Sequence, residues 1–229
     1  MPQFKYYDLM MAAFVVVLIC SNIIGPAKLA TLNIGEFNFI YGAGVLFFPL
    51  SYVFGDVLTE VYGYARARKV IWVGFGGVFF ASIMSYVIVA LPPAPGWQGQ
   101  EAYSLIFGQV PRIVLASLIA FFIGEMINAY VMARMKLLTR GKHLWSRTIG
   151  STIVGQGFDS LIFYPVAFFG IWDNDILLTV MFSNFLIKVL WEAALTPITY
   201  KLVSVLKRVE NVEIFDEKTN FSPFKISID

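Results

Sequence analysis

The chain has 229 residues, of which 58% are hydrophobic and only 14% are charged. Its mean hydropathy of +0.72 is too high for a soluble domain of this length, so we expect an integral membrane protein. A net charge of +2 gives no indication of nucleic-acid binding, and the single cysteine, Cys20, excludes a disulfide framework and a cysteine metal site.

Six apolar segments are long enough to be membrane-spanning helices, which need about 20 mainly apolar residues. The sequence therefore predicts an all-α integral membrane protein with six transmembrane helices. In chain order the predicted spans are Leu9–Ile24, Ile40–Glu60, Val70–Leu91, Ile113–Met135, Thr148–Ile171 and Ile176–Leu202.

Two local patterns follow the first span. Gly25-Pro26 predicts the end of the helix, because proline lacks a backbone donor and clashes with the preceding turn. Between Ala30 and Tyr41, apolar and polar residues alternate, which predicts a short hairpin or a re-entrant loop at the surface.

Basic residues are concentrated in the connections that follow the second, fourth and sixth spans. The opposite connections, Pro92–Gln100 and Trp172–Asp175, contain no lysine or arginine. By the positive-inside rule, we expect both termini to be cytoplasmic and the hairpin to be extracytoplasmic. We expect a transmembrane domain over residues 1–206 and a cytoplasmic tail over residues 207–229 that packs loosely or is disordered.

Most of the predicted spans carry polar side chains at similar membrane depth. Within a span these residues are three or four positions apart, so they share one helix face. We call the following set the polar layer and expect it to bind substrate: Asn22, Asp56, Glu125, Asn128, Gln156, Asp159, Asn184 and Lys188. Glu60 and Glu192 lie nearer the predicted cytoplasmic boundary, where we expect a role in gating or proton coupling.

Two interpretations of the polar layer compete. Buried polar residues can hold transmembrane helices together, and Lys188 could simply neutralise Glu125 or Asp159. However, a charge at membrane depth is expensive and usually faces a cavity. Because carboxylates outnumber the single lysine of the layer, we favour a cavity that holds water, a proton or a ligand.

Signatures of catalysis are missing from the sequence. It contains no HExxH, no Gly-x-Ser-x-Gly and no Walker A motif. We therefore expect no catalytic residues, no metal site and no cofactor.

Several long segments carry a family resemblance. They are Ser21–Lys28, Phe48–Val70, Ile123–Lys136, Arg147–Pro165 and Thr219–Phe224. These segments resemble the queuosine precursor transporter family of the vitamin uptake transporter group. The resemblance implies import of 7-cyano-7-deazaguanine, 7-aminomethyl-7-deazaguanine and, in some members, queuine, for the queuosine modification of tRNA. It also implies a prokaryotic cytoplasmic (inner) membrane.

The polar layer has suitable chemistry for such a base. A carboxylate, from Glu125 or Asp159, can accept the ring N–H and the exocyclic amine as a bidentate pair. Amide side chains of the layer could satisfy the carbonyl and the remaining ring nitrogens. The expected partners are thus a small-molecule substrate and the lipid bilayer, with no nucleic acid; monomer and homo-oligomer both remain open.

One alternative is a substrate-binding membrane subunit of an energy-coupling-factor vitamin importer. Such subunits dock through Ala-xxx-Ala on their first helix, whereas here Ala12 and Ala13 are followed by Val16 and Val17. An Ala116/Ala120 pair is present, but on the fourth span. The sequence leaves this alternative, the energy source and the preferred base open.

Overall fold

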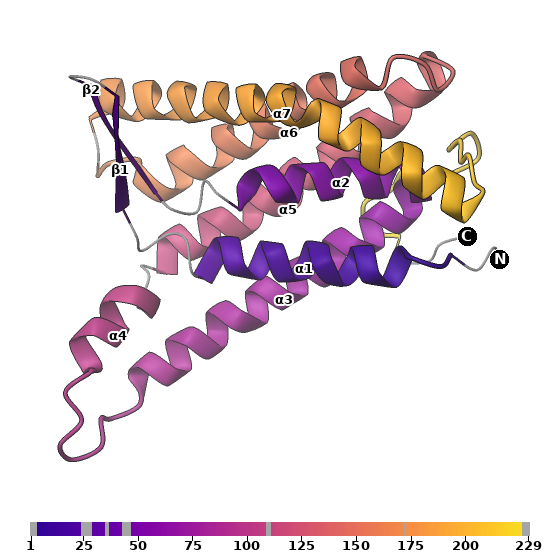
Figure 1. Ribbon diagram of the computed structural model, residues 1–229. Coiled ribbons are helices and arrows are strands. Elements are labelled where there is room, and N and C mark those ends of the chain that lie inside the picture. The colour runs from indigo at the N-terminus through magenta and orange to yellow at the C-terminus, as the bar shows by residue number, and fades with distance from the viewer. Residues whose placement is uncertain are drawn as a thin grey trace.

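The computed structural model describes residues 4–23, 29–34, 37–42, 47–108, 111–171 and 173–225. Its long helices lie side by side in an elongated bundle, and α4 extends from one end (Figure 1). The elements are α1 (Tyr7–Ile23), β1 (Leu29–Ile34), β2 (Phe37–Gly42), α2 (Phe48–Tyr62), α3 (Tyr64–Ala90), α4 (Gln100–Phe107), α5 (Pro111–Leu138), α6 (Leu144–Phe168) and α7 (Asn174–Glu210).

The helices overlap all six predicted spans. By length and composition, α3, α7 and the stretch that contains α5 are able to cross a membrane. Apolar side chains such as Phe80, Tyr86 and Leu115 are exposed on the bundle surface, as contact with lipid requires. The number of crossings and their orientation stay predictions.

The second predicted span was wrong in its first part. Ile40–Gly42 belongs to β2, and α2 begins only at Phe48, with Pro49 in its first turn. At 1.5 Å per residue, α2 is about 22 Å long, which is shorter than the hydrocarbon core of a bilayer. The apolar residues before Phe48 led to the wrong helix boundary, because aromatic and β-branched residues are favourable in strands as well as in membrane helices.

A hairpin occurs in the segment where alternation predicts it. Strands β1 and β2 pair antiparallel, from Leu29 opposite Gly42 to Ile34 opposite Phe37. Helix α1 ends at Ile23, and the Gly25-Pro26 pair lies outside the described residues.

The hydrophobic core lies between α1, α2, α3 and α5. Its fully buried members include Phe14, Val57, Val61, Val70 and Met132. Burial of such side chains from neighbouring helices fixes the four helices relative to one another, because interiors of this kind are closely packed.

Helices α5 and α6 make an unusually close contact at two glycines. A Cβ atom added at Gly155 would lie 2.7 Å from Asn128 Cβ and 2.9 Å from the Gly124 carbonyl oxygen. A Cβ at Gly124 would lie 3.0 Å from Asp159 Cβ. Small residues let membrane helices approach in this way, and here the approach places two polar faces against each other.

The tail packs firmly where it is described, contrary to the expectation of loose packing. The Asp216 carboxylate accepts the Tyr64 N–H at the start of α3, the Arg68 guanidinium donates to the carbonyls of Asn220 and Ser222, and the Trp72 indole donates to the Pro223 carbonyl. The predicted domain boundary at residues 206 and 207 also falls inside α7, which continues to Glu210.

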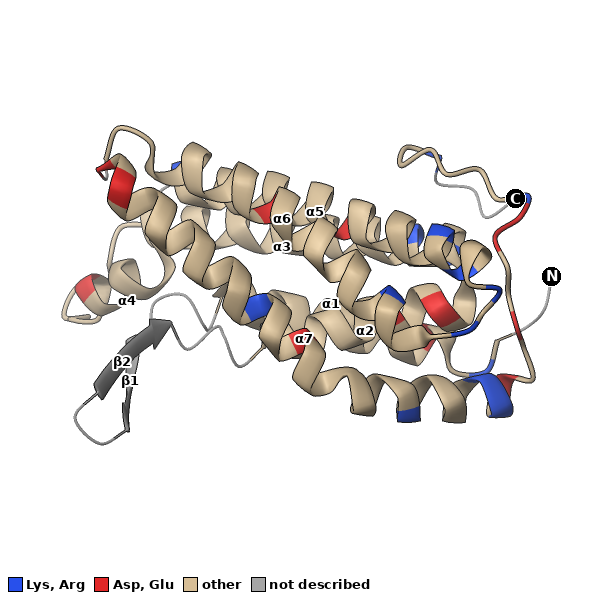
Figure 2. Cartoon of the chain, turned by 90° about the horizontal axis from the view of Figure 1, so that it is seen from above, with Lys and Arg blue, Asp and Glu red and all other residues tan. Residues whose placement is uncertain are grey.

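Most lysine and arginine residues gather at the end of the bundle that holds both termini (Figure 2). At this end, the Glu210 carboxylate accepts the backbone N–H groups of Lys5 and Tyr6, at 2.8 and 2.7 Å. This arrangement has the charge asymmetry that the positive-inside rule associates with a cytoplasmic side.

The α5–α6 contact predicts a position-specific effect of alanine. Gly155→Ala should lower the free energy of unfolding by about 1–3 kcal/mol through overpacking, measured by thermal or denaturant unfolding of purified protein in detergent. Gly157→Ala is the matched control, because its added Cβ would meet nothing closer than 3.9 Å. We expect it to be neutral or slightly stabilising, since alanine favours helix over glycine. Equal effects of the two changes would contradict the close contact.

Candidate functional site

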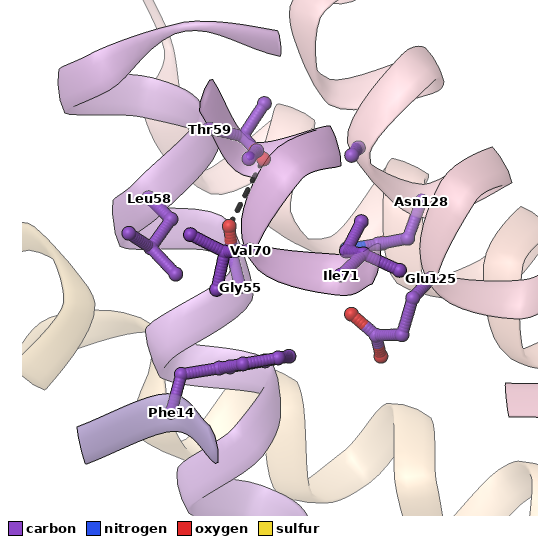
Figure 3. A pocket seen from close by; sticks show the side chains of 10 residues that line it. Phe14, Gly55, Leu58, Thr59, Val70, Ile71, Glu125 and Asn128 are labelled. Carbon is purple, nitrogen blue, oxygen red and sulfur yellow. Dashed lines mark hydrogen bonds between the residues drawn. The ribbon is translucent and has the colours of Figure 1, made fainter. Parts of the chain in front are cut away.

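A small cavity lies between α1, α2, α3 and α5 (Figure 3). Its polar lining comes from Glu125 and Asn128 on α5 and from Thr59 on α2, whereas Phe14 supplies an aromatic wall. Gly55 leaves the necessary room: a Cβ there would lie 3.2 Å from Glu125 Oε2. In this conformation the cavity has room for about one water molecule.

Asn128 connects the cavity to Asp56. Its Nδ2 donates to Asp56 Oδ1 at 3.1 Å, and both side chains are at least 95% buried. Asn128 Oδ1 and Asp56 Oδ2 have no hydrogen-bond partner among the described residues. Buried polar atoms are normally satisfied, so these two mark a place where a proton, water or ligand group is accommodated.

On the other side of α5, the close contact with α6 brings Gln156 and Asp159 next to Glu125 and Asn128. The Tyr52 hydroxyl donates to Gln156 Oε1 at 3.2 Å. Lys188 Nζ forms an ion pair with Asp159 Oδ2 at 2.5 Å, with both side chains about four-fifths buried. Lys188 thus neutralises Asp159, which is one of the two carboxylates that the sequence offers as its partner.

Glu125 and Asn128 are the members of the polar layer that line this cavity, and Asn22 and Asn184 are not part of its lining. Asn22 donates to the Leu18 carbonyl oxygen and accepts from Ser117 at 3.3 Å. Asn184 donates to the Val180 carbonyl oxygen. The structure therefore does not unite the whole polar layer around one cavity.

Glu60 lies in an ion-pair cluster that the sequence did not predict. Its Oε1 atom is 2.8 Å from Arg147, 2.7 Å from Lys207 and 3.4 Å from Lys136. These cations come from three different helices, at the end of the bundle that holds the termini (Figure 2). With three cationic partners, Glu60 joins α2 to α5, α6 and α7. The gating or proton-coupling role expected for it stays a prediction.

The tail adds a second carboxylate to this cluster. Glu213 accepts from Lys136 at 2.9 Å and from Lys207 at 2.8 Å. Partial burial alone would raise the pKa of Glu213, but the two lysine hydrogen bonds outweigh it and hold that pKa below its ordinary value. The cluster therefore ties α2, α5, α6, α7 and the tail together.

The ion pairs divide the buried carboxylates into two groups. Glu60 and Asp159 have cationic partners, whereas no salt bridge within the described ranges reaches Asp56, Glu125 or Glu192. Among the described residues no hydrogen-bond donor reaches either oxygen of Glu192, and the side chain is fully buried. The site thus combines a carboxylate at a cavity, Glu125, with a separate buried pair, Asp56 and Glu192.

Comparison with known proteins places this arrangement in a family of membrane transporters. A family model described as "Putative vitamin uptake transporter" matches residues 42–202. The chain belongs to this family, and it is accordingly a multi-pass transport protein of the cytoplasmic membrane and not an enzyme. No solved structure matches the chain.

Three relatives carry more particular names. The chain is 35% identical to the "Probable queuosine precursor transporter" of Bacillus subtilis (strain 168), over 74% of this chain and 72% of that protein. It is 31% identical to the protein of the same name from Haemophilus influenzae, over 58% of this chain and 54% of that protein. It is 30% identical to the "Queuosine precursor transporter" of Escherichia coli (strain K12), over 55% and 54%, respectively. The family resemblance predicted from sequence is confirmed.

The ion-pair cluster predicts a large stability effect. Glu60→Gln leaves three cations without their shared anion and should lower the free energy of unfolding by about 3–5 kcal/mol, as breaking a buried ion pair typically does. Glu217→Gln is the control, because Glu217 is an exposed carboxylate of the same tail region. Thermal unfolding in detergent measures both. If Glu60→Gln unfolds like Glu217→Gln, Glu60 does not hold the helices together.

Proposed function

We propose that the protein imports queuosine precursors, with a 7-deazaguanine base bound at the cavity that Glu125 and Asn128 line. The observation that carries this proposal is the buried carboxylate of Glu125, which faces a cavity and has no ion pair with any described residue. The names of the relatives support the substrate class.

The chemistry of the base suits Glu125. A 7-deazaguanine presents a ring N–H beside an exocyclic amine, and one carboxylate can accept both hydrogens as a charge-assisted pair. Asp159 is the weaker candidate of the two carboxylates, because Lys188 already occupies one of its oxygens. Asn128 could then offer its unpartnered Oδ1 to a donor of the base, and Phe14 an apolar face.

Binding requires the helices to separate. A cavity with room for about one water is too small for a bicyclic base, so the helices that line it would have to move apart to admit the base. The Glu60 cluster would close the path on the side that holds the termini, because it joins four helices there. Alternating opening of such contacts is how secondary transporters expose a site near the bilayer midplane to each side in turn.

The energy-coupling-factor alternative receives no support from the alanine pair on α5. Ala116 and Ala120 are both fully buried within this chain, so they offer no docking surface. Reconstitution of the purified protein without an ATPase decides the question: unaided uptake supports a stand-alone transporter, and a strict requirement for an ATPase supports the importer subunit.

The role of Glu125 predicts a loss of discrimination between two ligands. Wild-type protein should bind 7-cyano-7-deazaguanine about 10- to 100-fold more tightly than the analogue without the exocyclic amine, because a hydrogen bond to a charged group contributes about 1.5–3 kcal/mol. Glu125→Gln should weaken binding of the first ligand and narrow this ratio. Titration calorimetry of purified protein measures both affinities.

Two further variants make this experiment selective. Glu101→Gln is the control, because Glu101 is an exposed carboxylate on α4. Asp159→Asn should weaken binding of both ligands without narrowing the ratio of their affinities, because it leaves Lys188 without its anion. If Glu125→Gln keeps the wild-type ratio of affinities, Glu125 does not bind the exocyclic amine.

A further inference from the structure

Asp56 on α2 and Glu192 on α7 are not part of the lining of the cavity assigned to the base. Both side chains are fully buried. Three of their four oxygens, Asp56 Oδ2 and both oxygens of Glu192, receive no hydrogen bond from any N–H or O–H group of the described residues. The fourth, Asp56 Oδ1, accepts only the Asn128 amide.

Helix α2 packs against α7, and the two carboxyl groups are close enough for the charge of one to act on the other. A hydrogen bond between them would need a donor, and an ionised carboxylate can only accept. One member of the pair must therefore carry a proton for the contact to be favourable. Two adjacent carboxylates without a cation cannot both stay ionised at low cost, which is the reason why carboxyl pairs in other proteins share a single proton.

The neighbouring charges favour retention of this proton. The ionisable groups that act on the pair from the surrounding helices are Glu125 on α5 and Glu60 one turn further along α2, both acidic. Tyr52, also on α2, donates its hydroxyl to Gln156 and supplies no positive charge. The lysines and the arginine of the interior are engaged elsewhere, on Asp159 and Glu60.

From these contacts, we propose that Asp56 and Glu192 share one proton and that its uptake and release couple substrate import to the proton gradient. This inference rests on the proposed transport function and adds its energy source. The step is a simple protonation: one carboxylate takes a proton from water on the outer side and later returns it to water on the cytoplasmic side.

Asn128 connects the proton to the substrate. Its amide nitrogen holds Asp56, while the same side chain lines the cavity assigned to the base. A base that engages Asn128 would change the only hydrogen bond that Asp56 receives from the described residues other than Glu192. Occupancy of the cavity and protonation of the pair are thereby linked, and linkage of this kind acts equally in both directions.

The shared proton can be tested without any substrate. Infrared spectra are recorded at neutral pH on Glu125→Gln protein, which removes the other buried carboxyl group that has no ion pair among the described residues. These spectra should contain the C=O stretch of a buried carboxylic acid, shifted in heavy water. In this background the band should be lost when Asp56→Asn or Glu192→Gln is added, and retained when Glu213→Gln is added, because the Glu213 carboxylate is ion-paired. Absence of the band from Glu125→Gln protein, or its persistence in both pair variants, would overturn the inference.

Coupling is tested in liposomes that contain only this protein. With one proton per substrate, a gradient of one pH unit, acidic outside, supports up to about tenfold accumulation of labelled 7-cyano-7-deazaguanine. Glu192→Gln should lose this accumulation and only equilibrate the substrate, while it retains exchange of labelled for unlabelled substrate.

The outcomes separate the two proposals. If wild-type protein neither accumulates nor exchanges any 7-deazaguanine, the proposed function fails, and the infrared band still decides whether the pair holds a proton. Unchanged accumulation in Glu192→Gln, or accumulation driven by a sodium gradient and not by protons, would overturn coupling through this pair.

Discussion

The cost of burying a carboxylate inside a membrane bundle is the constraint on which the rest of the structure depends. Each buried carboxylate needs a cation, a hydrogen-bond donor or a proton. Glu60 receives three cations and Asp159 receives one lysine. No ion pair among the described residues reaches Asp56, Glu125 or Glu192, and Asp56 accepts one hydrogen bond, from Asn128. The proposed function concentrates on these three carboxylates.

The carboxylates that join helices and the carboxylates of the proposed site lie at different places along the bundle. At the end that holds the termini, the Glu60 cluster and the tail join the helices, and cations from distant parts of the chain meet there. Further in, the close approach of Gly124 and Gly155 sets α5 against α6 and brings the polar faces together. An ion-pair cluster that joins four helices thus lies in the same bundle as a small polar cavity.

The sequence predicted the helices and the polar faces well, because apolar length and three- or four-residue spacing are local properties. It could not predict that α2 is short, since the apolar residues before Phe48 suit a strand equally well. Nor could it predict the partners of Glu60, which come from Lys136, Arg147 and Lys207. In the sequence these three residues lie at or beyond the ends of predicted spans, where they indicate only the orientation of the helices.

The tail and the buried acidic pair show the same limit. Arg68 binds backbone carbonyls of the tail. Every residue has a backbone carbonyl, so the sequence cannot identify which ones accept these hydrogen bonds. Asp56 and Glu192 are 136 positions apart in sequence, and only tertiary packing of α2 against α7 brings them together. The sequence identified both as ionisable residues within predicted membrane spans. It could not show whether the two carboxyl groups share a proton or carry separate charges.

The central claim is that a cavity lined by Glu125 recognises a 7-deazaguanine. The most direct measurement is the unfolding temperature of purified protein against increasing concentrations of guanine, 7-cyano-7-deazaguanine, 7-aminomethyl-7-deazaguanine and queuine. A ligand that binds only the folded state stabilises it by mass action. We predict a concentration-dependent rise with at least one 7-deazaguanine and a smaller one with guanine; no rise with any 7-deazaguanine would contradict the account.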